Sequence, residues 1–394
     1  MEISLSANIQ RIKPSPTLAV NAKAQQLAAQ GKDIIALGVG EPDFDTPKHI
    51  KQAAIQAIEA GKTKYTAVDG ILSLKQAVCE KMANFNKLNY KPSQAIISNG
   101  GKQAIFNLVL SLLNPGDEAI IPAPYWVSYY DMVLFAGGNP VVIEADLSQN
   151  FKITPEQLKK AITPKTKLFF INSPSNPTGI GYTRQELKAL GEVLAAHPNI
   201  IVATDDMYEH IWWAKESFSN IVMACPELYD QTVVLNGVSK AYSMTGWRLG
   251  YACGPEKLIK AMNTLQGQST SNASSISQAA AEAALRGPQD SVKEMVEAFK
   301  KRHDYVVESL NNLKYIQCLP GDGTFYAFAR VQDFIDQHPT IKNDLDLGEF
   351  LLQEAGVAVV PGSAFGAEGY MRLSFATSMQ LLEAAMARFS KVFK

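Results

Sequence analysis

Between residues 95 and 255 the sequence alternates short runs of β-branched and other apolar residues with longer segments of helical periodicity. Apolar runs of this length that contain few polar residues are typical of strands buried on both faces. Strands that alternate with helices favour a mostly parallel sheet with helices on both sides. We therefore predict an α/β fold of three layers, with strands at residues 95–98, 118–121, 141–145, 167–172, 199–204 and 232–237 and helices at 102–113, 126–136, 155–162 and 183–196.

The two ends of the chain have a different pattern. Residues 1–47 are rich in turn formers, including four prolines. After residue 290, a charged helical pattern over 292–310 is followed by short strand-like pieces and a final amphipathic helix. We predict a large domain at residues 48–290 and a smaller α+β domain at 291–394, against which the N-terminal segment 1–47 packs.

Composition excludes several classes of protein. The 394 residues include 37 Lys and Arg and 38 Asp and Glu, and the resulting net charge of −1 argues against a nucleic-acid partner. The first 16 residues lack the apolar stretch of a signal peptide, and the most apolar segment, 105–113, is too short to span a membrane. The 4 cysteines form no CxxC pair, which is typical of reduced thiols. We expect a soluble, cytoplasmic protein.

Common catalytic motifs are missing or incomplete. The 5 histidines are dispersed without metal-binding spacing, so we expect no metal site. Residues 38–43 (GVGEPD) begin like a dinucleotide-binding motif but lack its third glycine. Residues 237–241 (GVSKA) end in alanine where the nucleophile elbow of a serine hydrolase needs glycine.

Four polar clusters instead follow predicted strands, at 98–103 (SNGGKQ), 173–179 (SPSNPTG), 205–208 (DDMY) and 239–251 (SKAYSMTGWRLGY). Each of them alone also fits a structural turn or a helix cap. Open α/β sheets bind ligands beyond the carboxyl ends of their strands. Together, the clusters predict one binding site at that edge.

The motifs PYWVSY, NPTG, DDMYE, SKAYSMTGWRLG and YMRLSFATS, in this order, resemble the fold-type I aminotransferases that use pyridoxal phosphate. The resemblance covers the whole chain. The KPS, VNAKA and GGKQA segments are most similar to a bacterial subgroup of aspartate aminotransferases, some of which also accept prephenate.

The resemblance implies a role for individual residues at the cofactor. Lys240 would bind the cofactor covalently and later move a proton, and Asp205 would pair with the pyridine nitrogen, a role for which the neighbouring Asp206 is the weaker candidate. Tyr208 and Asn176 would bind the ring hydroxyl. Trp126 would stack on the face of the cofactor ring, where a large aromatic plane limits the tilt of the ring.

The phosphate would lie on the backbone of Gly101 and Lys102, with Arg248 as a planar partner. Family members often have a serine where this chain has Gly237, and Ser239 is a candidate replacement. Tyr65 matches a tyrosine that reaches the phosphate from a second subunit, which implies a homodimer with shared active sites.

On the substrate, the resemblance assigns the α-carboxylate to Arg372, assisted by Gly40, Asn176 and Trp126. A dicarboxylic substrate needs a further cation, because an unpaired buried charge is costly. The resembled subgroup offers Lys102 for this role, and Lys13 and Ser15 would join it when the N-terminal segment closes over the site.

The expected activity is ping-pong transfer of an amino group from L-aspartate to 2-oxoglutarate. Alternatives remain open at this point: an aspartate/prephenate or another amino-acid aminotransferase, a carbon–sulfur lyase or decarboxylase on the same scaffold, and a cofactor-binding regulator.

Overall fold

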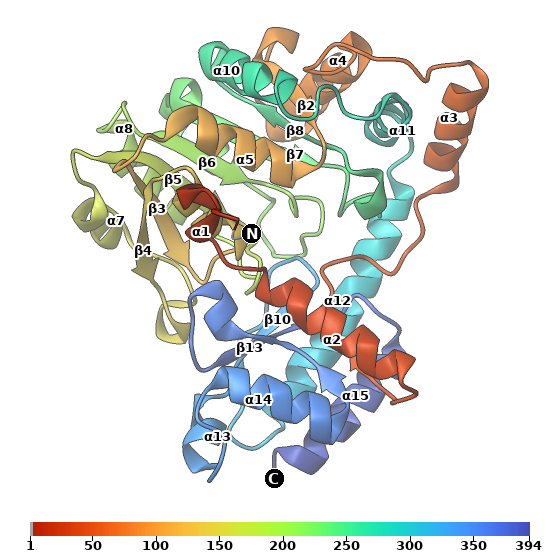
Figure 1. Cartoon of the computed structure of the whole chain (residues 1–394), viewed down its shortest axis with the longest axis vertical. Coiled ribbons are helices and arrows are strands. Elements are labelled where there is room, and N and C mark those ends of the chain that lie inside the picture. Colours follow the sequence, from red (N-terminus) through yellow and green to blue (C-terminus); the bar gives the residue numbers. More distant parts are fainter. Residues whose placement is uncertain (1–2) are drawn as a thin grey trace.

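A seven-stranded sheet forms the centre of the larger part of the molecule in the computed structural model, which describes residues 3–394 (Figure 1). Its strand order is β2-β8-β7-β6-β5-β3-β4. Neighbouring strands are parallel except around β8, which is antiparallel to both β2 and β7. The strands are β2 (Ala95–Ser98), β3 (Glu118–Ala123), β4 (Asn139–Glu144), β5 (Thr166–Asn172), β6 (Ile201–Asp205), β7 (Thr232–Gly237) and β8 (Gly250–Cys253).

The sheet confirms the predicted α/β class and all six predicted strands. Strand β8 was not predicted, because its first residues belong to the segment 239–251, which we interpreted as a cluster of site residues rather than as a strand. Every residue of β2, β7 and β8 is buried, as expected for strands covered by helices on both faces.

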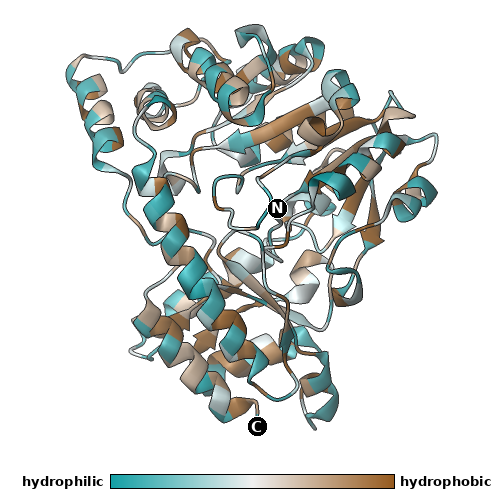
Figure 2. Ribbon diagram, turned by 180° about the vertical axis from the view of Figure 1, so that it is seen from behind, coloured by the Kyte–Doolittle hydropathy of each residue, from teal (hydrophilic) through white to brown (hydrophobic). Residues whose placement is uncertain are grey.

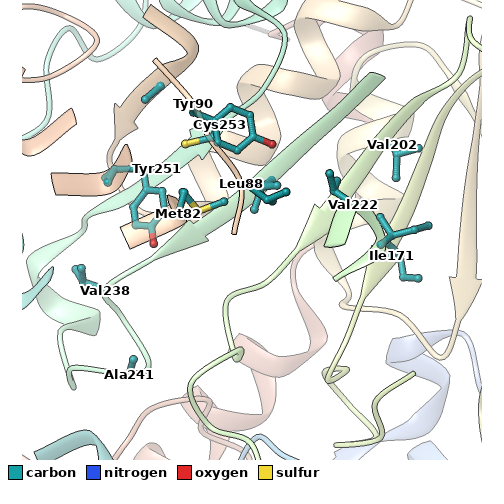
Figure 3. Packing of buried hydrophobic residues seen from close by; sticks show 14 of the residues in the cluster. Met82, Leu88, Tyr90, Ile171, Val202, Val222, Val238, Ala241, Tyr251 and Cys253 are labelled. Atoms are coloured by element: carbon teal, nitrogen blue, oxygen red, sulfur yellow. The ribbon is translucent and has the colours of Figure 1, made fainter. Parts of the chain in front are cut away.

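Successive residues of these strands enter two separate hydrophobic cores. Ile96 and Phe170 face a core that includes residues of α5, α6 and α10, whereas Ile97 and Phe169 face a core that includes α4, α8 and α11. Figure 3 shows members of the second core, among them Met82, Leu88 and Tyr251. The alternation produces the three predicted layers. The helices are α4 (Leu72–Lys81), α5 (Gly101–Leu112), α6 (Ser128–Phe135), α8 (Arg184–Ala195), α10 (Glu256–Gly267) and α11 (Ser275–Arg286).

The hydropathy of each element matches its position. In Figure 2 the strands of the central sheet are largely hydrophobic, and the outer helices carry both hydrophilic and hydrophobic residues. None of the helices within residues 3–394 is both long enough and apolar enough to cross a membrane. This part also contains α3 (Lys48–Glu59), α7 (Pro155–Ala161), α9 (Ile221–Ala224), a π-helical turn at Met82–Asn86 and short 3-10 helices.

The C-terminal part is built on a second, antiparallel sheet of order β12-β13-β10-β9. The long helix α12 (Asp290–Asn311) runs from the large sheet to this part, and α15 (Met379–Val392) packs beside it (Figure 1). The other elements are β9 (Gln317–Cys318), β10 (Tyr326–Arg330), α13 (Gln332–Gln337), α14 (Asp344–Phe350), a second π-helical turn (Leu351–Ala355), β11 (Val357–Ala358), β12 (Val360–Pro361) and β13 (Tyr370–Ser374).

The N-terminal segment contacts both parts of the molecule. Strand β1 (Ile35–Ala36) pairs in parallel with β11, and α2 (Pro16–Ala29) contacts β11 and β12. The short helix α1 (Ala7–Gln10) instead contacts α6 of the large part. We propose the domain boundaries at residues 47 and 290 that the sequence predicts.

Candidate active site

A cleft of about 340 Å³ lies between the carboxyl ends of the central strands and the C-terminal part. Asn172 and Asp205, the last residues of β5 and β6, line it on one side, and Tyr326 and Arg372 line it on the other. This is the edge at which the polar clusters were expected. The cleft brings together these predicted residues: Ser15, Gly40, Gly101, Lys102, Trp126, Asn176, Asp205, Tyr208, Ser239, Lys240, Arg248 and Arg372.

One end of the cleft is suited to an anion. Helix α5 begins at Gly101, and a Cβ at the preceding Gly100 would lie 2.4 Å from Nη2 of Arg248. Gly100 also has φ +83°, which side chains other than that of glycine rarely adopt. Backbone N–H groups at a helix start, the helix dipole and a guanidinium together favour a phosphate.

Lys240 occupies the middle of the cleft. Its Nζ donates a hydrogen bond to the carbonyl oxygen of Gly40 at 2.5 Å, and within residues 3–394 it forms no salt bridge. Loss of hydration, together with the charges of Arg248 and Arg372, lowers its pKa to about 8, although Glu41 and Asp205 oppose the shift. An amine with this pKa is partly neutral near physiological pH and can act as a nucleophile or a base.

Asp205 is the buried carboxylate of the site. Its Oδ2 accepts a hydrogen bond from the Tyr129 hydroxyl at 2.5 Å, and its Oδ1 accepts one from the Met207 backbone N–H at 3.2 Å. Burial raises the pKa of Asp205, and both hydrogen bonds oppose this shift. Asp206 does not line the cleft; its carboxylate accepts hydrogen bonds from Thr204 and Asn220.

Arg372 is 2 % exposed and lies in β13. Its Nη1 donates to Oδ1 of Asn176 and its Nη2 to the carbonyl oxygen of Gly38, both at 2.8 Å, while Nε is buried without a partner. The guanidinium lies 4.3 Å from the ring centroid of Tyr326. Within the described residues no carboxylate neutralises it, so the site holds a buried cation ready for an anionic ligand.

Lys102 is placed beside the cleft by the first turn of α5. Its Nζ lies 5.0 Å from the ring centroid of Trp126. The surrounding protein and the charge of Arg248 lower the pKa of Lys102. Lys102 therefore adds a positive charge to the pocket, separate from those of Arg248 and Arg372.

Besides the weaker candidate Asp206, two predicted residues do not line the cleft. Tyr65 is 92 % exposed, in the loop between α3 and α4. Lys13 lies before α2, near the Asp131 carboxylate of α6. Ser15, two residues further on, does line the cleft and precedes the first residue of α2.

Sequence reasoning missed Tyr129 and Tyr326. Tyr129 lies three residues after Trp126 at the start of a predicted helix, and this spacing could have placed both on one face. Tyr326 lines the cleft, and its hydroxyl lies 3.1 Å from that of Tyr208. No local signal marked it, because its partners are distant in sequence.

Comparison with known proteins agrees with this geometry. The profile of the family "Aminotransferase class I and II" matches residues 32–389. An aspartate/prephenate aminotransferase of Nitrosomonas europaea is 56% identical, over 99% of this chain and 100% of that protein. A second protein of that name, from Cereibacter sphaeroides, is 53% identical, over 98% of this chain and 97% of its own.

Solved structures are similarly close. The aspartate aminotransferase of Rhizobium meliloti has a TM-score of 0.95 and 46% identity, covering 99% of this chain and 98% of its own. The aspartate aminotransferase of Thermus thermophilus with maleate has a TM-score of 0.93 and 43% identity, covering 99% of this chain and 100% of its own.

The three-layer fold, the partly buried lysine and the anion-binding end of the cleft are consistent with an aminotransferase. The chain belongs to the class I and II aminotransferases, as the sequence motifs predicted.

Proposed function

We propose that this enzyme transfers the amino group of L-aspartate to 2-oxoglutarate, giving oxaloacetate and L-glutamate, with pyridoxal phosphate as cofactor. The observation that carries the proposal is Arg372, a buried cation in the same cleft as the lysine Lys240. A buried charge without a partner is costly, and the α-carboxylate of an amino acid would neutralise it. The names of the similar enzymes support aspartate as the amino donor.

The residues of the cleft fit pyridoxal phosphate. The start of α5, where a Cβ at Gly101 would lie 2.3 Å from Met207 Cε, would bind the phosphate with Arg248 and Ser239. Trp126 would cover the ring face, Asp205 would bind the ring nitrogen, and Tyr208 and Asn176 the ring hydroxyl. When bound, the cofactor supplies an electron sink that stabilises negative charge at the substrate Cα.

Different side chains of the protein would orient the substrate and transfer its proton. Arg372, held by Asn176 and Gly38, fixes the α-carboxylate and so orients the Cα–H bond. The neutral form of Lys240 would accept the proton from the substrate Cα and, once protonated, would donate it at the C4′ position of the cofactor. Because Gly40 has no side chain, its backbone can lie close to Tyr326. A Cβ at this position would lie 2.7 Å from the Tyr326 hydroxyl oxygen.

For the distal carboxylate of aspartate we propose Lys102, with Ser15 beside it. The Thermus thermophilus enzyme was solved with maleate, a dicarboxylate, which supports a pocket of this kind. Lys13 would join only if the segment before α2 moved towards the cleft. Prephenate is a second candidate amino acceptor, favoured by the names of the relatives at 56% and 53% identity.

We further propose a homodimer in which Tyr65 reaches the phosphate of the partner subunit. The exposure of Tyr65 supports this, because a tyrosine that is 92 % exposed in one chain is available to a second. A cytoplasmic location stays a prediction.

Two measurements test the function. Aspartate and 2-oxoglutarate are incubated with the purified protein, and oxaloacetate is measured; a parallel reaction replaces 2-oxoglutarate with prephenate. Borohydride reduction followed by peptide mapping should label Lys240. Release of ammonia or carbon dioxide without oxaloacetate would favour a lyase or a decarboxylase, and label on another lysine would contradict the site.

A further inference from the structure

We propose that Tyr129 is a positioning residue for the reaction: its hydroxyl orients the Asp205 carboxylate and keeps it anionic, as the partner of the cofactor ring nitrogen requires. This inference rests on the proposed function. Tyr129 itself does not line the cleft, so it would act through Asp205 rather than on the substrate.

The hydrogen bond has the geometry of a strong, charge-assisted contact. The distance from the Tyr129 hydroxyl oxygen to Asp205 Oδ2 is 2.5 Å, and O–H donors to carboxylates typically lie at about 2.5–2.7 Å. The other donor to this carboxylate, the Met207 N–H, is longer at 3.2 Å. Within residues 3–394, Asp205 forms no salt bridge. Tyr129 is therefore its closest donor.

Packing fixes the direction of the Tyr129 hydroxyl. The ring is stacked on Phe170 of β5, with centroids 4.6 Å apart and planes at 14°. The ring of Trp126 packs edge-on against it, with the ring centroids 5.3 Å apart and the ring planes at 79°. Tyr129 is buried, and burial together with the neighbouring Asp205 raises its pKa well above the usual value. The phenol thus stays protonated and can only donate to the carboxylate.

Electrostatics explain why the carboxylate needs this donor. Burial raises the pKa of Asp205, and the Tyr129 hydrogen bond is the largest opposing effect, followed by the Met207 N–H and the charge of Lys240. The other titratable groups near this pair are Tyr208 and Asp206. A protonated Asp205 would lose its attraction for a protonated ring nitrogen, so removal of the hydroxyl should weaken cofactor binding first at low pH.

The test is Tyr129→Phe, which removes the hydroxyl and keeps the ring. Cofactor affinity is measured by titrating cofactor-free protein with pyridoxal phosphate between pH 5 and pH 9. We expect roughly tenfold weaker binding, as for loss of a hydrogen bond to a charged group, and an acidic fall in affinity that begins at higher pH than in the wild type. The matched control is Tyr182→Phe, which also loses a buried hydroxyl, one that accepts from Ile153 N at 2.9 Å outside the cleft.

A double-mutant cycle separates positioning from a general loss of stability. In an Asp205→Asn background, Tyr129→Phe should change cofactor affinity less than twofold, because the carboxylate through which it acts is gone. Equal effects in both backgrounds, or a pH profile unchanged from wild type, would overturn the inference. If wild-type protein bound no pyridoxal phosphate, the proposed function itself would fail, which is a distinguishable result.

Discussion

Arg372 donates a hydrogen bond to Asn176 over 2.8 Å, although the two residues are 196 positions apart. Asn176 follows β5, and its backbone N–H bonds to the side chain of Asn172, whose Nδ2 donates in turn to the Asp205 carbonyl oxygen. One chain of hydrogen bonds thus joins the Arg372 guanidinium in the C-terminal sheet to the backbone of Asp205 in the central sheet. The two sheets share one site, and its geometry depends on how they pack.

The first prediction concerns substrate choice. Lys102→Ala should lower kcat/KM for aspartate by more than tenfold, or about 1.4 kcal/mol, because the distal carboxylate would lose its cation. Alanine has no such carboxylate and should be affected much less. Arg372→Lys is the comparison variant, and it should lower kcat/KM for both substrates, since both have an α-carboxylate. Equal losses for aspartate and alanine in Lys102→Ala would assign Lys102 to the cofactor or the fold.

The second prediction is that the rate at which Lys240 reacts with the cofactor depends on pH. Its pKa of about 8 lies below that of an ordinary lysine, so its neutral form accumulates as the pH rises through 8. The rate at which cofactor-free enzyme reacts with pyridoxal phosphate, followed by absorbance, should rise with pH and level off above about 8. A rate still climbing near pH 10 would indicate an unshifted amine.

Glu41 provides a check on the cause of that shift. Its charge raises the pKa of Lys240, so Glu41→Gln should move the midpoint of the same profile to lower pH. Glutamine can still accept the hydrogen bond that Thr245 donates to Glu41 at 2.6 Å. An upward movement of the midpoint would contradict the assigned sign.

The third prediction tests the shared active site. Tyr65→Ala and Lys240→Ala should each be nearly inactive as pure proteins. After subunit exchange, mixed dimers contain one site that carries neither change, and activity should recover to roughly a quarter of the wild-type value for an equal mixture. Exchange demonstrated by mass spectrometry without any recovery would argue that Tyr65 serves its own chain or none.

The fourth prediction concerns a buried ion pair beneath the site. Lys81 donates to Glu209, whose carboxylate also accepts from Asn86 at 2.8 Å and from Asn236 at 2.6 Å. Burial alone would raise the pKa of Glu209, but Lys81 and its other partners lower it. Removing one member of such a pair costs about 3–5 kcal/mol, whereas replacing both is often nearly neutral.

We therefore expect Lys81→Met and Glu209→Gln each to lower the free energy of unfolding by about 3 kcal/mol, and the double variant by less than the sum. Denaturant titration of the cofactor-free protein measures this. Glu256→Gln breaks an exposed pair with Lys260 and should leave the free energy of unfolding nearly unchanged, because solvent screens such pairs. Additive losses in the double variant would show that the two charges do not stabilise each other.

Local patterns in the sequence determined the strands of the central sheet and the residues that end them. Strands such as β5 and β7 contain uninterrupted apolar runs (LFFI and VVL), and this pattern can be recognised without knowledge of the neighbouring strands. The same locality explains why Asp205, at the end of β6, and Lys240, shortly after β7, could be identified as site residues from the order of the motifs. The pattern of strands and helices predicted that the site lies at the carboxyl edge of the sheet. The family resemblance implied the role of each residue there.

Tertiary structure alone decided the contacts between distant segments. Strand β8 is buried and antiparallel because it closes the sheet between β2 and β7, a pairing that four residues cannot signal locally. Tyr129 and Tyr326 enter the site through partners 76 and 118 positions away, Asp205 and Tyr208 respectively. Hydrogen bonds of this kind depend on how helices and sheets pack in space, and the periodicity of a single segment carries no information about that packing.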